Sequence, residues 1–88
     1  MSILNIKRHH SYFVRQVEAY RKSLKNAVCY CWHMQQRGLK APDTLHIRRL
    51  LCETSRYFQM NDDLLRYSYQ RLRDANHEIT PMLFKETG

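Results

Sequence analysis

Three residues of the kinds that bind metal ions, Cys29, Cys31 and His33, lie close together in the sequence, and His9 and His10 lie far upstream. Side chains four residues apart share a helix face, so Cys29 and His33 are neighbours while Cys31 points roughly the opposite way. The three cannot converge on one ion, and zinc sites normally draw four ligands from paired motifs. The spacing therefore predicts packing roles and no metal. An odd number of cysteines also favours reduced thiols over a disulfide framework.

Catalysis would need a nucleophile beside a base, or paired carboxylates in a cleft. The only acidic pair is Asp62 with Asp63, which follows Asn61 where a new helix is expected to begin. Capping and the helix dipole explain acidic residues at that place. The two glycines are isolated, so a glycine-rich phosphate loop is missing. We expect a binding protein and not an enzyme.

Basic residues are in large excess, with 15 Lys and Arg against 8 Asp and Glu and a net charge of +7. Such an excess attracts polyanions and acidic proteins alike. The basic residues flank the apolar stripes of the expected helices, and such residues ordinarily form a charged helix face exposed to solvent. The imbalance of sign favours a surface for an acidic partner. The residues concerned are Arg21, Lys22, Lys25, Arg48, Arg49 and Arg56.

Tyrosines interleaved with arginines indicate a second kind of partner. Arg66, Tyr67, Tyr69 and Arg71 lie within six residues. Aromatic rings and guanidinium groups can stack on unpaired nucleotide bases, so a basic helical RNA-binding protein, such as a mitochondrial ribosomal protein, is the alternative. Helical tyrosines are more often packed with their hydroxyl groups at the surface, and this alternative stays open.

The elements that must position these residues are three helices. Segment 11–37 contains neither Gly nor Pro and carries apolar residues at steps of three and four. Segment 38–44 predicts a turn, segment 44–60 a second helix, and segment 62–79 a third that ends before Pro81. The expected inner positions are Phe13, Val17, Tyr20, Leu24, Val28 and Cys31, then Ile47, Leu50, Leu51, Thr54 and Phe58, and then Leu65, Ser68 or Tyr69, Leu72, Ala75 or Asn76, and Ile79.

The predicted fold is all-α, a three-helix antiparallel up-down-up bundle with a long first helix and an irregular C-terminal tail. Residues 1–88 form a single domain, with an N-terminal arm at 1–10 and an apolar tail at 80–88. No apolar run is long enough to span a membrane. The basic opening, in which Glu18 is the first acidic residue, is compatible with organelle targeting, although a basic arm explains it as well.

Segment 19–28, which reads Ala-Tyr-Arg-Lys-Ser-Leu-Lys-Asn-Ala-Val, resembles the opening of the LYR proteins. Their first helix carries Leu-Tyr-Arg and then a Leu three residues after the Arg. Ala19 stands in place of the first Leu, and Leu24 matches the second. Phe58 resembles the phenylalanine that precedes the family's turn into its third helix. The resemblance extends from about Val14 to Ile79.

This resemblance implies a small mitochondrial subunit or adaptor, on the matrix side of the inner membrane, that binds an acyl carrier protein. The partner's acyl-4'-phosphopantetheine would enter between the helices, and the chain would have no cofactor of its own. Tyr20, Arg21 and Phe58 would occupy the motif positions, while the other basic residues named above are added on charge alone. The Tyr-Arg segment, the aromatic and Cys-containing helix end that follows it, and the tail at 81–84 together look most like the small LYR accessory subunit of the respiratory complex I membrane arm.

An acyl chain would need an apolar channel, and the expected inner stripes could line one. An ordinary core filled by its own side chains is the alternative, as in a structural subunit of another respiratory complex with no bound carrier. The channel residues expected are Leu24, Val28, Ile47, Leu51, Phe58, Leu65 and Leu72.

Overall fold

The computed structural model describes the backbone of residues 3–87 and the side chains of residues 10–83. Three helices make up the fold: α1 (Ile3–Gln36), α2 (Leu45–Glu53) and α3 (Asp62–Thr87), with a short 3-10 turn, η1 (Tyr57–Gln59), before α3. Residues 3–87 contain no strand. The predictions of an all-α fold, of three helices and of a long first helix are confirmed.

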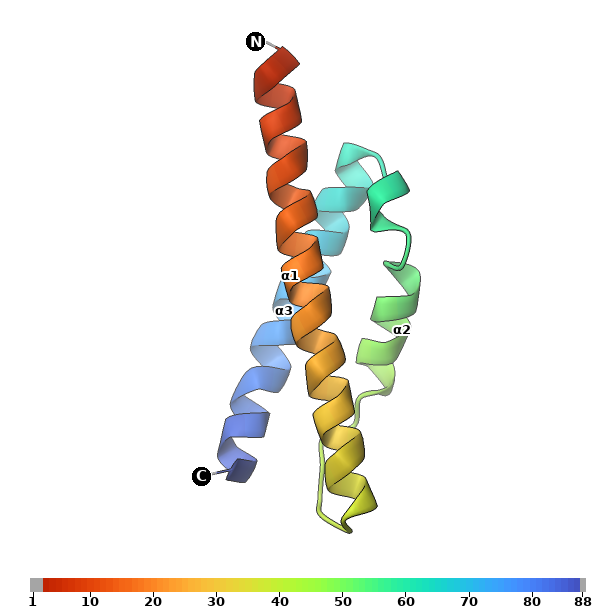
Figure 1. Cartoon of the computed structure of the whole chain (residues 1–88), viewed down its shortest axis with the longest axis vertical. Helices are drawn as coiled ribbons and strands as arrows, with labels where there is room; N and C mark the ends of the chain where they lie inside the picture. The colour runs from red at the N-terminus through yellow and green to blue at the C-terminus, as the bar shows by residue number, and fades with distance from the viewer. Residues whose placement is uncertain (1–2, 88) are drawn as a thin grey trace.

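The molecule is elongated, with principal extents of 54 × 24 × 14 Å. Helix α1 is 34 residues long and runs the length of the view in Figure 1, and α3 packs along it more extensively than α2 does. The short α2 lies beside the C-terminal half of α1, and the N-terminus and C-terminus lie towards opposite ends of the molecule. Gly38, with a φ of 75°, allows the chain to leave α1.

The core is a strip of small and medium apolar side chains between the helices. Its completely buried members include four of the expected positions, Val17, Leu24, Leu65 and Leu72. Burying an aliphatic side chain stabilises a fold by about 1.5–3 kcal/mol, so this strip holds the helices together. The remaining buried apolar positions are Ala27, Cys31, Met34, Ile47, Leu50, Ala75 and Ile79. Where two neighbours were candidates, Ser68 and Ala75 are the buried ones.

The prediction of a second helix up to residue 60 is wrong, because α2 ends at Glu53. Thr54 terminates it: its backbone N–H bonds to the Leu50 carbonyl, and its hydroxyl donates to the same oxygen at 2.8 Å. A threonine hydroxyl that bonds to a backbone carbonyl in this way competes with the backbone hydrogen bonds of a continuing helix. The apolar period therefore does not carry on to Phe58, whose side chain is 63% exposed.

The prediction of an irregular C-terminal tail is wrong for the described residues, and the expected N-terminal arm is part of a helix. Helix α1 begins at Ile3, and the ring of His10 lies 3.1 Å from a carboxylate oxygen of Asp62, at the start of α3. Helix α3 continues through Pro81 to Thr87. Proline removes one N–H from a helix but does not forbid helix beyond it, and Leu83 packs against the core. Of the apolar tail residues, the side chain of Phe84 lies outside the described part.

Within residues 3–87, none of the helices has an apolar stretch of the length and hydropathy that a bilayer span requires. The two long helices each carry a buried apolar stripe, and exposed large side chains such as Trp32 and Tyr67 lie outside it.

We expect the substitution Pro81→Ala to stabilise the fold, because it restores a helical N–H and removes a ring clash that costs up to about 3 kcal/mol inside a helix. The gain is measurable as a higher thermal midpoint, with little change in helical circular dichroism because α3 already continues through residue 81. Thr80→Ala is the matched control, because it changes the neighbouring residue without touching the helical N–H of position 81. A strong rise in helical circular dichroism in Pro81→Ala would show that α3 is interrupted at Pro81 in the native chain.

Candidate functional site

Arg21 lies at the junction of α1 with the C-terminal end of α2. Only 9% of its surface is exposed. One of its terminal nitrogens donates to the carbonyl of Leu51 at 2.6 Å and to the hydroxyl of Thr54. The guanidinium carbon also lies 5.8 Å from the ring centroid of Tyr57. A cation is favourable here because the last carbonyl groups of a helix lack partners within it and carry negative partial charge.

The expected role of Arg21 as a contact for a carrier protein stays a prediction, and the structure gives this side chain other partners. Its side chain is already committed to backbone and hydroxyl acceptors of the same chain, and removing it from them would leave those groups unpaired. Burial also limits the surface that a partner could reach. Arg21 is in the first place a positioning residue, which holds α1 against the end of α2.

Next to Arg21 the surface is hollowed. This basic hollow, with a volume of about 310 Å³, lies between α1 and the segment that follows α2. Lys22 and Lys25 are exposed on its wall, and Ser55 is exposed opposite them. Its one acidic residue, Glu18, accepts a hydrogen bond of 2.6 Å from the hydroxyl of Tyr57. Three cations against one engaged carboxylate make this hollow electropositive.

Tyr57 closes one side of the basic hollow. The hydrogen bond from its hydroxyl to Glu18 is the main cause that raises its pKa above the ordinary value of 10.0. Partial burial and the negative charge of Glu18 act in the same direction, while the charge of Arg21 lowers the pKa. The neutral phenol is thus favoured, and it links α1 to η1 as a donor.

The other expected carrier-binding residues do not gather in this hollow. Arg48, Arg49 and Arg56 are exposed on α2 and the segment after it, and none of them lines the hollow. Tyr20 is half-buried and its ring lies 5.9 Å from that of Tyr69 on α3. The ring of Phe58 instead lies 6.0 Å from that of Tyr57. The motif residues Tyr20 and Phe58 therefore have different neighbours.

The expected acyl-chain residues form a packed core. Leu24, Ile47, Leu65 and Leu72 are at most 1% exposed, and Val28 and Leu51 pack against them while partly exposed. Phe58 is not part of this core. It is 63% exposed and lies five residues beyond the end of α2, and its place in an acyl-chain channel stays a prediction. In the described conformation, the interhelical space at these buried positions holds the chain's own side chains.

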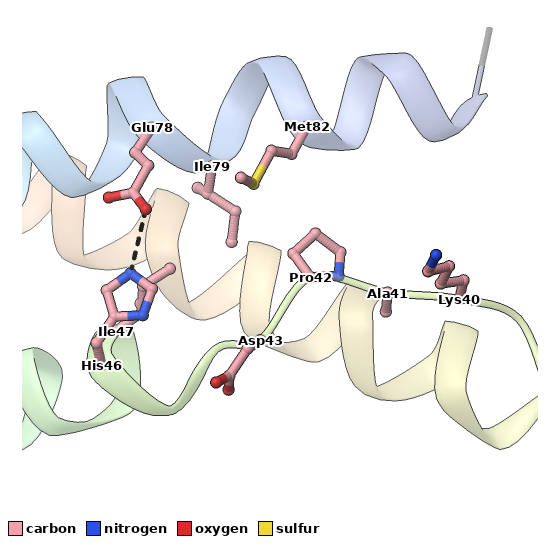
Figure 2. A pocket seen from close by; sticks show the side chains of 9 residues that line it. All are labelled: Lys40, Ala41, Pro42, Asp43, His46, Ile47, Glu78, Ile79 and Met82. Carbon is pink, nitrogen blue, oxygen red and sulfur yellow. Dashed lines mark ion pairs between the residues drawn. The ribbon is translucent and has the colours of Figure 1, made fainter.

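A second hollow, the α2–α3 cleft, has a volume of about 530 Å³. It lies between segment 40–47 and the side chains of Glu78, Ile79 and Met82 on α3 (Figure 2). Ile47 is the one expected channel residue that lines it. Sequence reasoning missed this cleft, because its two walls are more than thirty residues apart and are joined only by folding.

No cluster of three or more His, Cys, Asp or Glu side chains that could hold a metal ion occurs among the described residues. Cys31 is buried, and burial raises the pKa of its thiol, which disfavours the reactive thiolate. Cys29 is exposed on the other side of the helix. The expected separation of these two cysteines is confirmed.

The arginines of the expected RNA-binding segment stack on aromatic rings of the chain itself. The guanidinium carbon of Arg66 lies 5.5 Å from the ring centroid of Phe13, and that of Arg71 lies 5.5 Å from Tyr67. Arg71 also pairs with Glu53 at 2.6 Å. A base stacking on Arg71 would compete with these contacts, although the ring of Tyr67 itself is exposed.

We expect Arg21→Met to lower the free energy of unfolding by about 2–5 kcal/mol, because a methionine leaves the Leu51 carbonyl and the Thr54 hydroxyl without their donor. Arg21→Lys should restore only part of the loss, since an ammonium group cannot reproduce the planar guanidinium. Lys22→Met and Lys25→Met, on the exposed wall, are the controls and should change stability by no more than about 0.5 kcal/mol. Urea titration measures all four, and equal effects for Arg21 and the lysines would refute the positioning role.

The bond between Tyr57 and Glu18 predicts a loss of stability at high pH. The pKa of Tyr57 is higher in the folded chain than in the unfolded one, so its stabilisation is complete below a pH of about 10 and disappears as the pH rises through the folded-state value. The advantage of the native chain over Tyr57→Phe should therefore shrink above pH 10. Urea titrations between pH 8 and about 11 measure the difference. A constant difference would show that the phenol proton is not involved.

Comparison of the chain with protein-family models, curated proteins and solved structures found no match. Its function is therefore inferred from its own residues, contacts and charges.

Proposed function

We propose that the chain is a non-catalytic adaptor that binds an acyl carrier protein within a mitochondrial assembly, respiratory complex I, on the matrix side of the inner membrane. The observation that carries the proposal is the basic hollow, in which Arg21, Lys22 and Lys25 of one helix meet a single, already hydrogen-bonded carboxylate. The resemblance of segment 19–28 to LYR proteins supplies the identity of the acidic partner. The net charge of +7 supports an acidic partner in general.

The three cations of the basic hollow have different roles in this proposal. Arg21 holds the wall of the hollow in place through Leu51 and Thr54, while the exposed ammonium groups of Lys22 and Lys25 meet carboxylates of the carrier. Arg48, Arg49 and Arg56 lie outside the hollow and extend the positive field over α2. Such a field mainly accelerates and orients docking, so its effect falls as salt concentration rises.

The proposal also gives a place to the carrier's acyl-4'-phosphopantetheine. In an antiparallel up-down-up bundle, the carrier's acyl chain would enter beside Val28 and Leu51, which are the expected channel residues that are only partly buried. Because the positions beneath them are filled, entry requires α2 to move away from the core. Each methylene buried there would stabilise the complex by about 0.8 kcal/mol. Helix α2 is the short helix with the smaller contact to α1, which makes such a movement the least costly one.

Two rival functions have their own observations. RNA binding is supported by the exposed ring of Tyr67 with Arg71 stacked beside it. A structural subunit of another respiratory complex, with no carrier attached, is supported by the filled core. Mass spectrometry of the native assembly distinguishes the proposed adaptor from both rivals, since a copurifying phosphopantetheine protein is expected only for the adaptor.

We expect the double variant Lys22→Glu and Lys25→Glu to weaken binding of acylated carrier protein roughly tenfold or more, because reversed charges face the carrier's carboxylates. The matched control is Arg15→Glu with Arg37→Glu, which changes the net charge equally at two exposed residues outside the hollow and should retain most of the affinity. Isothermal titration at low and physiological salt measures both. Equal losses in the two variants would mean that only overall charge matters and that the hollow is not the site.

The same titrations with a single-stranded RNA test the rival function of RNA binding. Binding of RNA with a steep salt dependence, together with no binding of the carrier, would replace the proposed function with nucleic-acid binding.

A further inference from the structure

Arg21 has more hydrogen-bond donors than the chain itself uses. A guanidinium group carries N–H donors on every one of its nitrogens, yet the bonds of Arg21 to the Leu51 carbonyl and the Thr54 hydroxyl both start from one terminal nitrogen. Among the described residues, no completely buried side-chain nitrogen or oxygen lacks a partner. The nitrogens of Arg21 outside these bonds therefore reach the small part of its surface, 9%, that is exposed.

These unused donors face the basic hollow, because Arg21 lines it. The exposed ammonium groups of Lys22 and Lys25 belong to the same hollow, and the segment after α2 adds the exposed hydroxyl of Ser55. Ammonium and hydroxyl groups can turn their donors towards a group that is bound between them. The hollow is thus suited to a ligand that offers several acceptor oxygens.

The charge of the basic hollow is positive even when its carboxylate is counted in full. Its three cations meet one anion, Glu18, and the hydrogen bond that Glu18 accepts from Tyr57 leaves that negative charge in place. Two positive charges remain, and none of the described residues that line the hollow is a histidine, which would change this count near neutral pH. A dianion balances these charges, whereas a single carboxylate or a sulfate ester balances half of them.

We propose that the basic hollow binds a small phosphate monoester. Such a group carries a charge of about −1.5 to −2 at neutral pH and several strong acceptor oxygens, which match the charge and the donors of the hollow. The unused donors of Arg21 bind these oxygens from the buried side, and Lys22 and Lys25 bind them from the wall.

The size of the hollow agrees with a small ligand. Its volume of about 310 Å³ is at the lower end of the range for small-molecule sites, roughly 300–1,000 Å³. The site uses the two lysines of the proposed carrier contact, but it does not require a carrier protein. A phosphate monoester and the carrier would compete for these lysines.

Phenyl phosphate, phenyl sulfate and benzoate form a matched series of probes, titrated into the full-length chain and followed by nuclear magnetic resonance of backbone amides. The three share a phenyl ring, and the sulfate ester keeps the tetrahedral shape with a single negative charge. Saturable shifts should concentrate at Lys22, Lys25, Ser55 and Tyr57. We expect phenyl phosphate to bind about fivefold more tightly than either monoanion, because only the dianion pairs with both lysines in addition to Arg21.

The pH separates charge from shape. Lowering it from about 7.5 to about 5 protonates phenyl phosphate, because the second pKa of a phosphate monoester is about 6. The preference for phenyl phosphate over phenyl sulfate should then largely disappear. Phenyl sulfate keeps its charge over this range, so its own affinity reports any titration of the chain.

One pair of substitutions tests the exposed cations. Lys22→Gln with Lys25→Gln should weaken phenyl phosphate binding about four- to twentyfold, the effect of two solvent-exposed ion pairs. Arg37→Gln with Lys40→Gln removes the same charge at exposed residues outside the hollow and is the matched control, with binding nearly unchanged.

Glu18→Gln tests the charge count in the opposite direction. It removes the negative charge of the hollow and keeps a side-chain oxygen that can accept from Tyr57. We expect phenyl phosphate to bind about two- to fivefold more tightly to this variant. A tighter complex cannot result from loss of the fold, and circular dichroism checks that every variant is folded.

Three results would overturn the phosphate site. Equal affinities for the three probes would show that the hollow does not select a dianion. Equal losses in the lysine pair and its control, or weaker binding to Glu18→Gln, would show that the hollow does not set the affinity. Absence of saturable shifts at the hollow in the folded native chain would show that it is not a ligand site.

The carrier titrations keep this inference separate from the proposed function. Carrier binding without phenyl phosphate binding would reject the phosphate site alone. Phenyl phosphate binding at the hollow without carrier binding would support the phosphate site and reject the adaptor function.

Discussion

The guanidinium group of Arg21 joins the first helix to the carbonyl end of the second, and the arrangement of the basic hollow depends on this contact. Helix α2 is only nine residues long, and an isolated helix of that length is marginal in water. Its end is stabilised by Thr54 within the segment and by Arg21 from α1. The same contact brings Ser55 and Tyr57 against α1, so the wall of the basic hollow forms where α2 ends.

The core and the surface hollows have different physical roles. The buried leucines of α1 and α3, Leu24, Leu65 and Leu72, belong to the apolar core strip that holds the helices together. Both hollows lie where α2 or the segments flanking it meet a longer helix. Short elements cannot cover the whole side of a long neighbour, so concave and partly exposed surfaces remain at both ends of α2. One of them has cations on its wall, and the other has an apolar middle.

Polar contacts with the chain itself restrict which residues a partner can use. Arg21, Arg66 and Arg71 each engage a hydrogen bond, an ion pair or an aromatic ring of this protein. Lys22 and Lys25 stay exposed on α1 beside the hollow. A basic sequence thus contains two kinds of cation, those that hold the fold and those that face solvent, and this distinction matters more for binding than the net charge does.

The amino-acid sequence by itself determined three helices, a long first helix and a core containing Leu24, Leu65 and Leu72, because apolar spacing is a local property that survives folding. It also determined the separate faces of Cys29 and Cys31. Only the tertiary structure decided that α2 ends at Glu53, that Phe58 is exposed, that α3 passes through Pro81, and that Arg21 is buried. The burial of Arg21 depends on contacts between segments far apart in the chain, because Arg21 meets Leu51 and Thr54 thirty and thirty-three residues away, and such distances leave no periodic signal in a sequence.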